Sequence, residues 1–219
     1  HKYMNRMLGL KSIVRPRRPV HKHGEAHNVF ENKLRQDFYA DRINQKWCTD
    51  FTYLYLSNGE VRYNCAILDL HDRSVVASIT DRSITSDLAI RTVQKALASQ
   101  PKIQGELILH SDQGSQFTSK AFIEFRESVH VTQSMSKAGY PYDNAPMERY
   151  FNTLKNECTN LYKYDDEDAL YQAVEDFAYV EYNYVRPHRL YPEFCVNSAL
   201  DVKRSKIFTR RHCNSRPPL

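Results

Sequence analysis

The sequence lacks the features that mark secreted, zinc-binding and membrane proteins. Its five cysteines are an odd number and include no C-x-x-C pair, so neither a disulfide framework nor a cysteine-rich zinc site is indicated. No run approaches the ~20 apolar residues that a membrane span requires, and the first residues lack the apolar core of a signal peptide. We therefore expect a soluble protein in a reducing, cytoplasmic compartment.

The composition allows a folded core and favours an acidic partner. The chain has 219 residues, 41% of them hydrophobic, which is enough for one domain of ~150 residues with extensions. The 31 Lys and Arg residues give a formal net charge of +5. Such an excess is compatible with nucleic-acid binding, but it is also found on ordinary solvated surfaces.

The chain changes character along its length. The first 14 residues contain a short amphipathic pattern of apolar residues. Prolines and Arg15, Arg17 and Arg18 follow, and they favour an extended segment that either lies along a phosphate backbone or is simply a solvated tether. From these changes we predict the end of an upstream helical DNA-binding module at 1–14, a basic linker at 15–44, an α/β core at 45–162, a C-terminal helical extension at 163–202 and a basic tail at 203–219.

The core has the pattern of a mixed α/β sheet. Its first three strands follow one another with short turns and predict an antiparallel meander. Later strands alternate with helices, which favours one five-stranded mixed sheet with helices on both faces. We predict strands at 47–56, 61–70, 74–79, 107–110 and 129–134, and helices that begin at Thr85 or Ser86, Ser119, Asp143 or Asn144, and Asp165 or Asp166.

Three carboxylates occupy positions where this sheet would bring them together. Asp50 lies in the first strand, Asp112 directly follows the fourth, and Glu148 lies about one turn into a helix. If the first and fourth strands are neighbours, Asp50 and Asp112 converge. Carboxylates that converge at neutral pH repel one another unless divalent cations neutralise them. The arrangement predicts a Mg²⁺ site, although ordinary surface carboxylates are the simpler interpretation of spacing alone.

The helix that carries Glu148 is expected to be amphipathic. A polar stripe of Glu148, Asn152 and Lys155 runs beside an apolar one, so one face packs and the next faces a site. The apolar stripe consists of Met147, Phe151, Leu154, Cys158 and Leu161.

Four ordered segments resemble a known family. Residues 46–53 (KWCTDFTY), 110–117 (HSDQGSQF), 142–148 (YDNAPME) and 182–188 (YNYVRPH) are similar to motifs in the integrase core of bacterial insertion-sequence transposases, which belong to the DDE group with retroviral integrases. The 35 residues between Asp112 and Glu148 match the spacing of that family.

The resemblance implies an RNase H-like fold in which Asp50, Asp112 and Glu148 bind Mg²⁺, with Mn²⁺ as a substitute. The implied reaction is metal-dependent hydrolysis at the element's end, followed by attack of the freed 3′-hydroxyl on another phosphodiester. The implied partner is DNA, both element ends and target, bound by at least a dimer at the bacterial nucleoid. Two alternatives remain open: a nuclease that only hydrolyses, and an inactive DNA-binding remnant. The DNA contacts implied by the resemblance are those of Asn144, Asn152 and Lys155.

Overall fold

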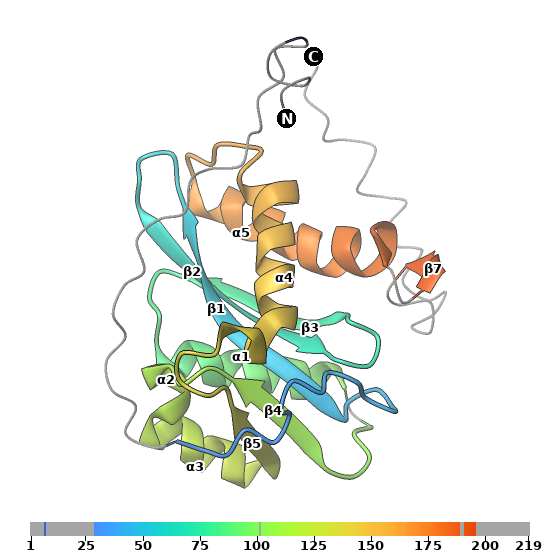
Figure 1. The fold of residues 1–219 in the computed structure, drawn as a ribbon. Coiled ribbons are helices and arrows are strands. Elements are labelled where there is room, and N and C mark those ends of the chain that lie inside the picture. Colours follow the sequence, from blue (N-terminus) through green and yellow to red (C-terminus); the bar gives the residue numbers. More distant parts are fainter. Residues whose placement is uncertain (1–6, 8–28, 101, 189–190, 196–219) are drawn as a thin grey trace.

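The computed structural model describes residue 7 and residues 29–100, 102–188 and 191–195 (Figure 1). The predicted basic tail at 203–219, nearly all of the predicted module at 1–14, and the three arginines of the predicted linker (Arg15, Arg17 and Arg18) therefore lie outside the described residues.

A five-stranded mixed sheet forms the centre of the molecule, as predicted. Its strands stand in the order β3-β2-β1-β4-β5. The first three form the antiparallel meander, while β4 runs parallel to β1 and β5 runs parallel to β4. The strands are β1 (Lys46–Tyr55), β2 (Val61–Asp69), β3 (Val75–Asp81), β4 (Leu107–Ser111) and β5 (Val131–Met135).

Helices cover both faces of the sheet (Figure 1). Three of them begin at the predicted caps, because the side chains of Thr85, Ser119 and Asp166 each accept a hydrogen bond from the backbone three residues on. The connection after β4 contains one short helix, α2 (Ser115–Thr118), that the sequence pattern did not predict. The helices are α1 (Ser86–Ser99), α2 (Ser115–Thr118), α3 (Lys120–Ser128), α4 (Ala145–Leu154) and α5 (Glu167–Asp176).

Neighbouring residues of β1 belong to different cores. Trp47 is fully buried in the cluster that β4, β5, α1 and α3 share. Cys48 is fully buried on the other side, in the cluster with Met147 and Leu154 of α4. Side chains of a strand alternate between faces, so β1 holds two layers of helices together. Residues of β1 whose side chains point to the same side as Cys48, including Asp50, therefore belong to the face of the sheet that α4 covers.

The chain after α4 departs from a regular α-helix. It continues as the π-helical turn η3 (Lys155–Thr159), and α5 likewise continues as π-helical η4 (Phe177–Val185) before the small hairpin of β6 (Pro187–His188) and β7 (Tyr191–Cys195). Of the predicted apolar stripe on α4, four residues are buried, but Leu161 is 50% exposed. The prediction for Leu161 was wrong because the helix ends at Thr159.

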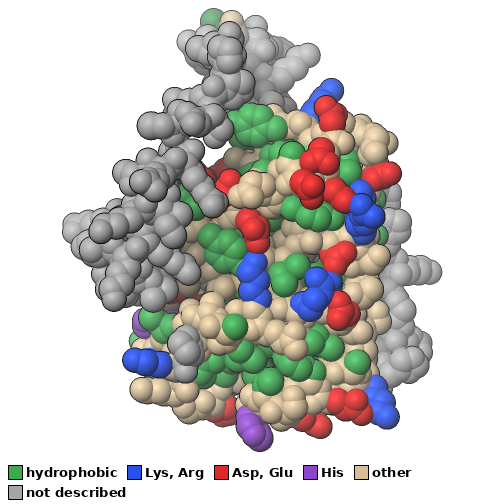
Figure 2. Space-filling model, turned by 180° about the vertical axis from the view of Figure 1, so that it is seen from behind, with side chains coloured by type: hydrophobic (Ala, Val, Ile, Leu, Met, Phe, Trp, Pro, Cys, Tyr) green, Lys and Arg blue, Asp and Glu red, His purple; other side chains and the backbone are tan. Residues whose placement is uncertain are grey.

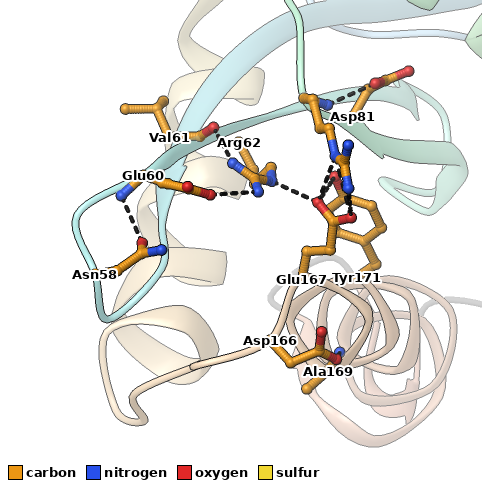
Figure 3. Close-up of polar contacts among 10 residues, drawn as sticks. Asn58, Glu60, Val61, Arg62, Asp81, Asp166, Glu167, Ala169 and Tyr171 are labelled. Carbon is orange, nitrogen blue, oxygen red and sulfur yellow. Dashed lines mark hydrogen bonds and ion pairs between the residues drawn. The ribbon is translucent and has the colours of Figure 1, made fainter.

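A cluster of arginines and carboxylates joins α5 to the sheet (Figure 3). Arg62 of β2 donates from Nε to Glu167 Oε2 at 2.9 Å and from Nη2 to Glu60 Oε2 at 2.7 Å. Arg82, which follows β3, also pairs with Glu167, and its Nε lies 2.9 Å from Oε2. One carboxylate at the start of α5 is thus held by arginines from two parts of the sheet.

The described part of the predicted linker, 29–44, is packed against the sheet rather than extended in solvent. Leu34 and Ala40 are 2% and 3% exposed and lie in the core that α4 shares. Phe30 packs against the other core and lies under the guanidinium of Arg126, 4.7 Å from the ring centroid. These apolar residues, spaced between polar ones, anchor the segment.

The charges on the face seen in Figure 2 are mixed, with lysines and arginines next to aspartates and glutamates. Several of the basic residues in α1 are engaged in ion pairs: Arg91 with Asp81 and Asp87, and Lys95 with Glu175. Among the described residues seen on this face, the basic side chains form no continuous track. Within the described ranges, no helix has the length and apolarity needed to cross a membrane.

Candidate active site

Asp50 and Asp112 lie side by side at the edge where β1 meets β4. The parallel register pairs Trp47 with Leu109 and Cys48 with His110. Continued by two residues, it brings Asp50 level with Asp112, just past the end of β4. The first and fourth strands are therefore neighbours, which is the condition under which Asp50 and Asp112 were expected to converge. The ends of parallel strands are a common location for sites in α/β sheets.

The Asp50 carboxylate is half-buried and already oriented by the protein. Its Oδ1 accepts a hydrogen bond from the backbone N of Phe51 at 2.7 Å, and its Oδ2 lies 3.4 Å from Nδ2 of Asn144. Burial, followed by the negative charges of Asp112 and Glu148, raises the pKa of Asp50 well above its ordinary value. Asp112 and Glu148 therefore both lie within electrostatic reach of Asp50.

Asp112 is fixed by a tight turn at Gly114. The Gly114 N donates to Asp112 Oδ1 at 2.9 Å, the Asx-turn geometry in which a carboxylate bonds the backbone two residues on. A Cβ on Gly114 would lie 2.9 Å from that oxygen and 3.0 Å from Oε1 of Gln116. A side chain at position 114 would thus displace the carboxylate. The turn-forming residues 111–114 after the fourth strand are the sequence signal for this position.

Glu148 is exposed in the first turn of α4. The helix is held on the sheet by Met147 and Phe151, which are 0% and 6% exposed. This packing leaves Glu148 on the rim of the site, where its charge still acts on Asp50. Among the residues that the structure describes, no three or more His, Cys, Asp or Glu side chains form a group that could hold a metal ion. The metal-binding role of the triad stays a prediction.

The predicted DNA-contacting residues occupy different environments. Asn144 is 5% exposed, and its Nδ2 donates to the carbonyl oxygen of Thr49 at 3.2 Å. Asn152 is exposed on α4, where its Oδ1 accepts from Asn156, and Lys155 is half-buried at the end of the helix. Contact of these residues with DNA stays a prediction. The position of Asn144 adds a second role, the orientation of Asp50.

His110 supports the strand end that carries Asp112. It is fully buried, with Nδ1 2.9 Å from Ser134 Oγ and Nε2 3.1 Å from Ser136 Oγ. Burial lowers its pKa to about 4, so the imidazole is neutral at pH 7. The two serines come from β5 and the residue that follows it, and no short pattern around His110 predicts this contact.

The sheet order and its flanking helices define the RNase H-like class of α/β fold. Two profiles described as integrase core domain match residues 40–141 and 129–190, which together span more than half of the chain. The chain therefore belongs to the integrase core domain family.

Curated relatives carry the names of insertion-sequence proteins. The chain is 34% identical over 160 residues to transposase InsF for insertion sequence IS3A of Escherichia coli strain K12, covering 73% of this chain and 55% of that protein. It is equally similar to an uncharacterized 31 kDa protein of insertion element IS600 from Shigella sonnei, of which it covers 58%. The chain thus spans less than two thirds of both relatives.

Solved structures share the fold at low identity. The catalytic core domain of HTLV-2 integrase in complex with magnesium aligns with a TM-score of 0.53 at 21% identity, covering 69% of this chain and 93% of that one. The catalytic domain of Mos1 transposase with Raltegravir and Mg gives a TM-score of 0.53 at 13% identity, covering 62% and 71%. At these identities the likeness concerns the fold alone.

Proposed function

We propose that the chain is the catalytic core of an insertion-sequence transposase, which cleaves DNA at the ends of an element and joins those ends to other DNA. The proposal is supported by family membership and by similarity to InsF. The single observation that carries it is that Asp50, within β1, and Asp112, just past the end of the neighbouring strand β4, are close enough for the charge of one to raise the pKa of the other.

The donor chemistry of this pair fits a divalent cation. Mg²⁺ prefers oxygen ligands and commonly takes one or two protein carboxylates, with water and substrate phosphate filling its other positions. Asp50 and Asp112 would hold it, with Glu148 as a third ligand from α4, and Mn²⁺ would substitute. When bound, the metal supplies charge stabilisation to the attacking and leaving oxygens of a phosphodiester. The HTLV-2 and Mos1 structures named above contain magnesium.

The chain's own residues contribute orientation. The backbone N of Gly114 fixes one carboxylate and the amide of Asn144 fixes the other. Helix α4 presents Glu148 at the rim, and Asn152 and Lys155 farther along it would hold the DNA. Preorganised ligands of this kind lower the barrier because they need not be ordered during the reaction.

The remaining parts of the chain have assigned roles within the same proposal. Residues 45–162 form the catalytic core, 163–202 extend it, and 1–14 and 15–44 are the end of a DNA-binding module and its linker, with Arg15, Arg17 and Arg18 on the phosphate backbone. The enzyme would act at the bacterial nucleoid on paired element ends, as a homo-oligomer of at least two chains.

The test is a strand-joining assay. The gene's flanking end sequences are supplied as labelled duplexes with a target plasmid and Mg²⁺ or Mn²⁺. Wild type is expected to give nicked and joined products, and Asp112→Asn is expected to give neither. Asp165→Asn, which removes an exposed carboxylate from the loop before α5, is the matched control and should retain full activity.

The other outcomes separate the competing functions. Cleavage without joined products would identify a nuclease that only hydrolyses. Binding of the end sequences by wild type without any metal-dependent cleavage would identify an inactive DNA-binding remnant. Equal activity in wild type and Asp112→Asn would overturn the assignment of the site.

A further inference from the structure

The segment before β1 is seated along the outer edge of β5. The backbone N of Lys33 donates to Ser134 Oγ at 2.9 Å, and Met135 N donates to the carbonyl oxygen of Glu31 at 3.4 Å. Leu34, 2% exposed, anchors the segment in the core beneath α4. The segment therefore covers a sheet edge that would otherwise be open, and it ends beside the loop that leads into α4.

Asp143 is the point where this segment contacts that loop. Its Oδ2 accepts from Nδ2 of Asn32 at 2.8 Å and from the backbone N of Lys137 at 2.9 Å, and its Oδ1 accepts from Nε2 of Gln36 at 2.8 Å. The side chain is almost completely buried, with Asp143 3% exposed. Asp143 is not the helix N-cap; it is a buried carboxylate satisfied by donors from two separate parts of the chain.

The next residue carries this contact to the carboxylates. Asn144 precedes α4 and donates from Nδ2 to the carbonyl oxygen of Thr49 and toward Oδ2 of Asp50. Its buried Oδ1 has no hydrogen-bond partner among the described protein atoms, so the hydrogen bonds of the amide are those of Nδ2 alone. Glu148 follows one turn into the helix that starts here.

We propose that Asp143 is a positioning residue that couples the upstream segment, residues 29–37, to the metal-binding carboxylates. With the segment seated, three hydrogen bonds fix Asp143, so Asn144 holds Asp50 and α4 begins with Glu148 on the rim. When the segment moves away, Asp143 loses the donors Asn32 and Gln36. The start of α4, which positions both Asn144 against Asp50 and Glu148 on the rim, is then no longer fixed. Arg15, Arg17 and Arg18 lie upstream of this segment in the sequence, so the phosphate backbone of DNA is the ligand that would act on it.

This inference rests on the proposed function, because it concerns the carboxylates assigned there to metal. It also makes a claim that activity alone does not test. Residues that orient metal ligands typically change metal affinity by 10- to 100-fold when they are removed. A residue that only supports the fold would lower the melting temperature without changing the metal affinity of the protein that remains folded.

The first test compares two substitutions at the same position. Asp143→Ala removes all three acceptor contacts and should weaken Mn²⁺ binding, measured by electron paramagnetic resonance, about 10-fold or more. Asp143→Asn should be close to wild type, because its remaining oxygen can still accept two of the bonds and the Gln36 amide can rotate to accept the third. Hydrogen exchange of amides 137–148 should rise in the alanine variant only.

The second test leaves the loop intact. The double variant Asn32→Ala with Gln36→Ala removes both upstream donors to Asp143, together with the hydrogen bond that Asn32 Oδ1 accepts from the backbone N of Arg35. It remains informative if Asp143→Ala does not fold. It should weaken Mn²⁺ binding by about 10-fold and lower kcat for strand joining more than it changes KM for DNA. The matched control is Glu31→Gln, a substitution in the same segment, where the Glu31 carboxylate pairs with Arg35; it should bind Mn²⁺ like wild type.

The outcomes keep this inference apart from the proposed function. Wild-type Mn²⁺ affinity in the folded double variant would overturn the coupling, whatever the enzyme does to DNA. Weakened Mn²⁺ binding in the double variant, together with a wild type that neither cleaves nor joins DNA, would uphold the coupling and overturn the proposed function.

Discussion

Two groups of carboxylates in this protein stand in opposite surroundings. Glu167, at the start of α5, is held by Arg82 and Arg62, and these hydrogen bonds lower its pKa to about 2. Asp50, at the centre of the sheet, is affected instead by its burial and by the charges of Asp112 and Glu148, which raise its pKa. The negative charge of Glu167 is therefore compensated by arginines of the same chain, whereas the negative charges around Asp50 add to one another.

The difference indicates which acids serve the fold and which serve the site. Several carboxylates that join elements have arginine partners, as in the pairs of Asp81 with Arg91 and of Glu157 with Arg186. Where carboxylates instead raise one another's pKa, the fold gains nothing from their charge, and a divalent cation is the natural partner. The following three substitutions test this division.

Asp50→Asn should have the largest effect. Loss of a metal ligand removes several kcal/mol of transition-state stabilisation, so strand joining should fall on the order of 10³-fold or more. In EDTA, however, the variant should melt at or above the wild-type temperature, because a buried charge that repels Asp112 has been neutralised. Calorimetry and the joining assay measure the two effects. A variant that is both inactive and clearly less stable would place Asp50 among the structural acids.

Gly114→Ala should have an intermediate effect confined to activity. The new Cβ would displace Asp112 Oδ1, and misplacement of a catalytic group by about 1 Å costs on the order of 10²-fold in rate. The backbone at position 114, with φ −58° and ψ 144°, suits alanine, so the fold should be retained.

Gly59→Ala is the matched control for Gly114→Ala. Gly59 has φ +89° in the hairpin between β1 and β2, with no atoms close to the added Cβ. Alanine is strained there, so stability should fall by about 1 kcal/mol while activity per folded molecule is unchanged. If the two variants lost activity and stability in the same proportion, Gly114 would have no particular relation to Asp112.

Glu167→Gln should have the smallest effect, on stability alone. The lowered pKa means that this carboxylate stabilises the fold above its ordinary pKa near 4.5 and loses that contribution as the pH falls toward 2. The variant should melt ~2–4 °C lower at pH 7, and the difference from wild type should shrink below pH 4.5. Asp168→Asn, in the same turn, is the control. A loss of joining activity would show that the cluster at α5 also serves the site.

Features encoded locally could be predicted from the sequence. The caps at Thr85, Ser119 and Asp166 and the antiparallel meander of the first three strands depend on short patterns of polar and apolar residues. In the apolar stripe predicted for the helix of Glu148, the burial of Leu161 was predicted wrongly, because the stripe was continued past the end of η3. Asp50, Asp112 and Glu148 were found because turns and helix starts around them have recognisable residues.

Contacts between residues far apart in the sequence could not be predicted, because no short pattern encodes them. Asn32 and Gln36 are more than 100 residues from Asp143, as Arg62 is from Glu167. A buried carboxylate with distant donors looks in the sequence like any surface aspartate, so Asp143 was taken for a possible helix cap. The segment that contains Asn32 was assigned to a linker because its few apolar residues follow a proline- and arginine-rich stretch.

The repulsion between Asp50 and Asp112 means that losing the site is expected to cost the fold no stability. If the chain acts as proposed, a gene copy that is released from selection for transposition can lose the charge of Asp50 by one substitution, and the resulting protein is expected to fold at least as well as its ancestor. Selection against misfolded protein will not remove such copies, so silent relatives should accumulate beside active ones in a genome. The cellular abundance of a chain like this one is then no guide to whether its element still moves.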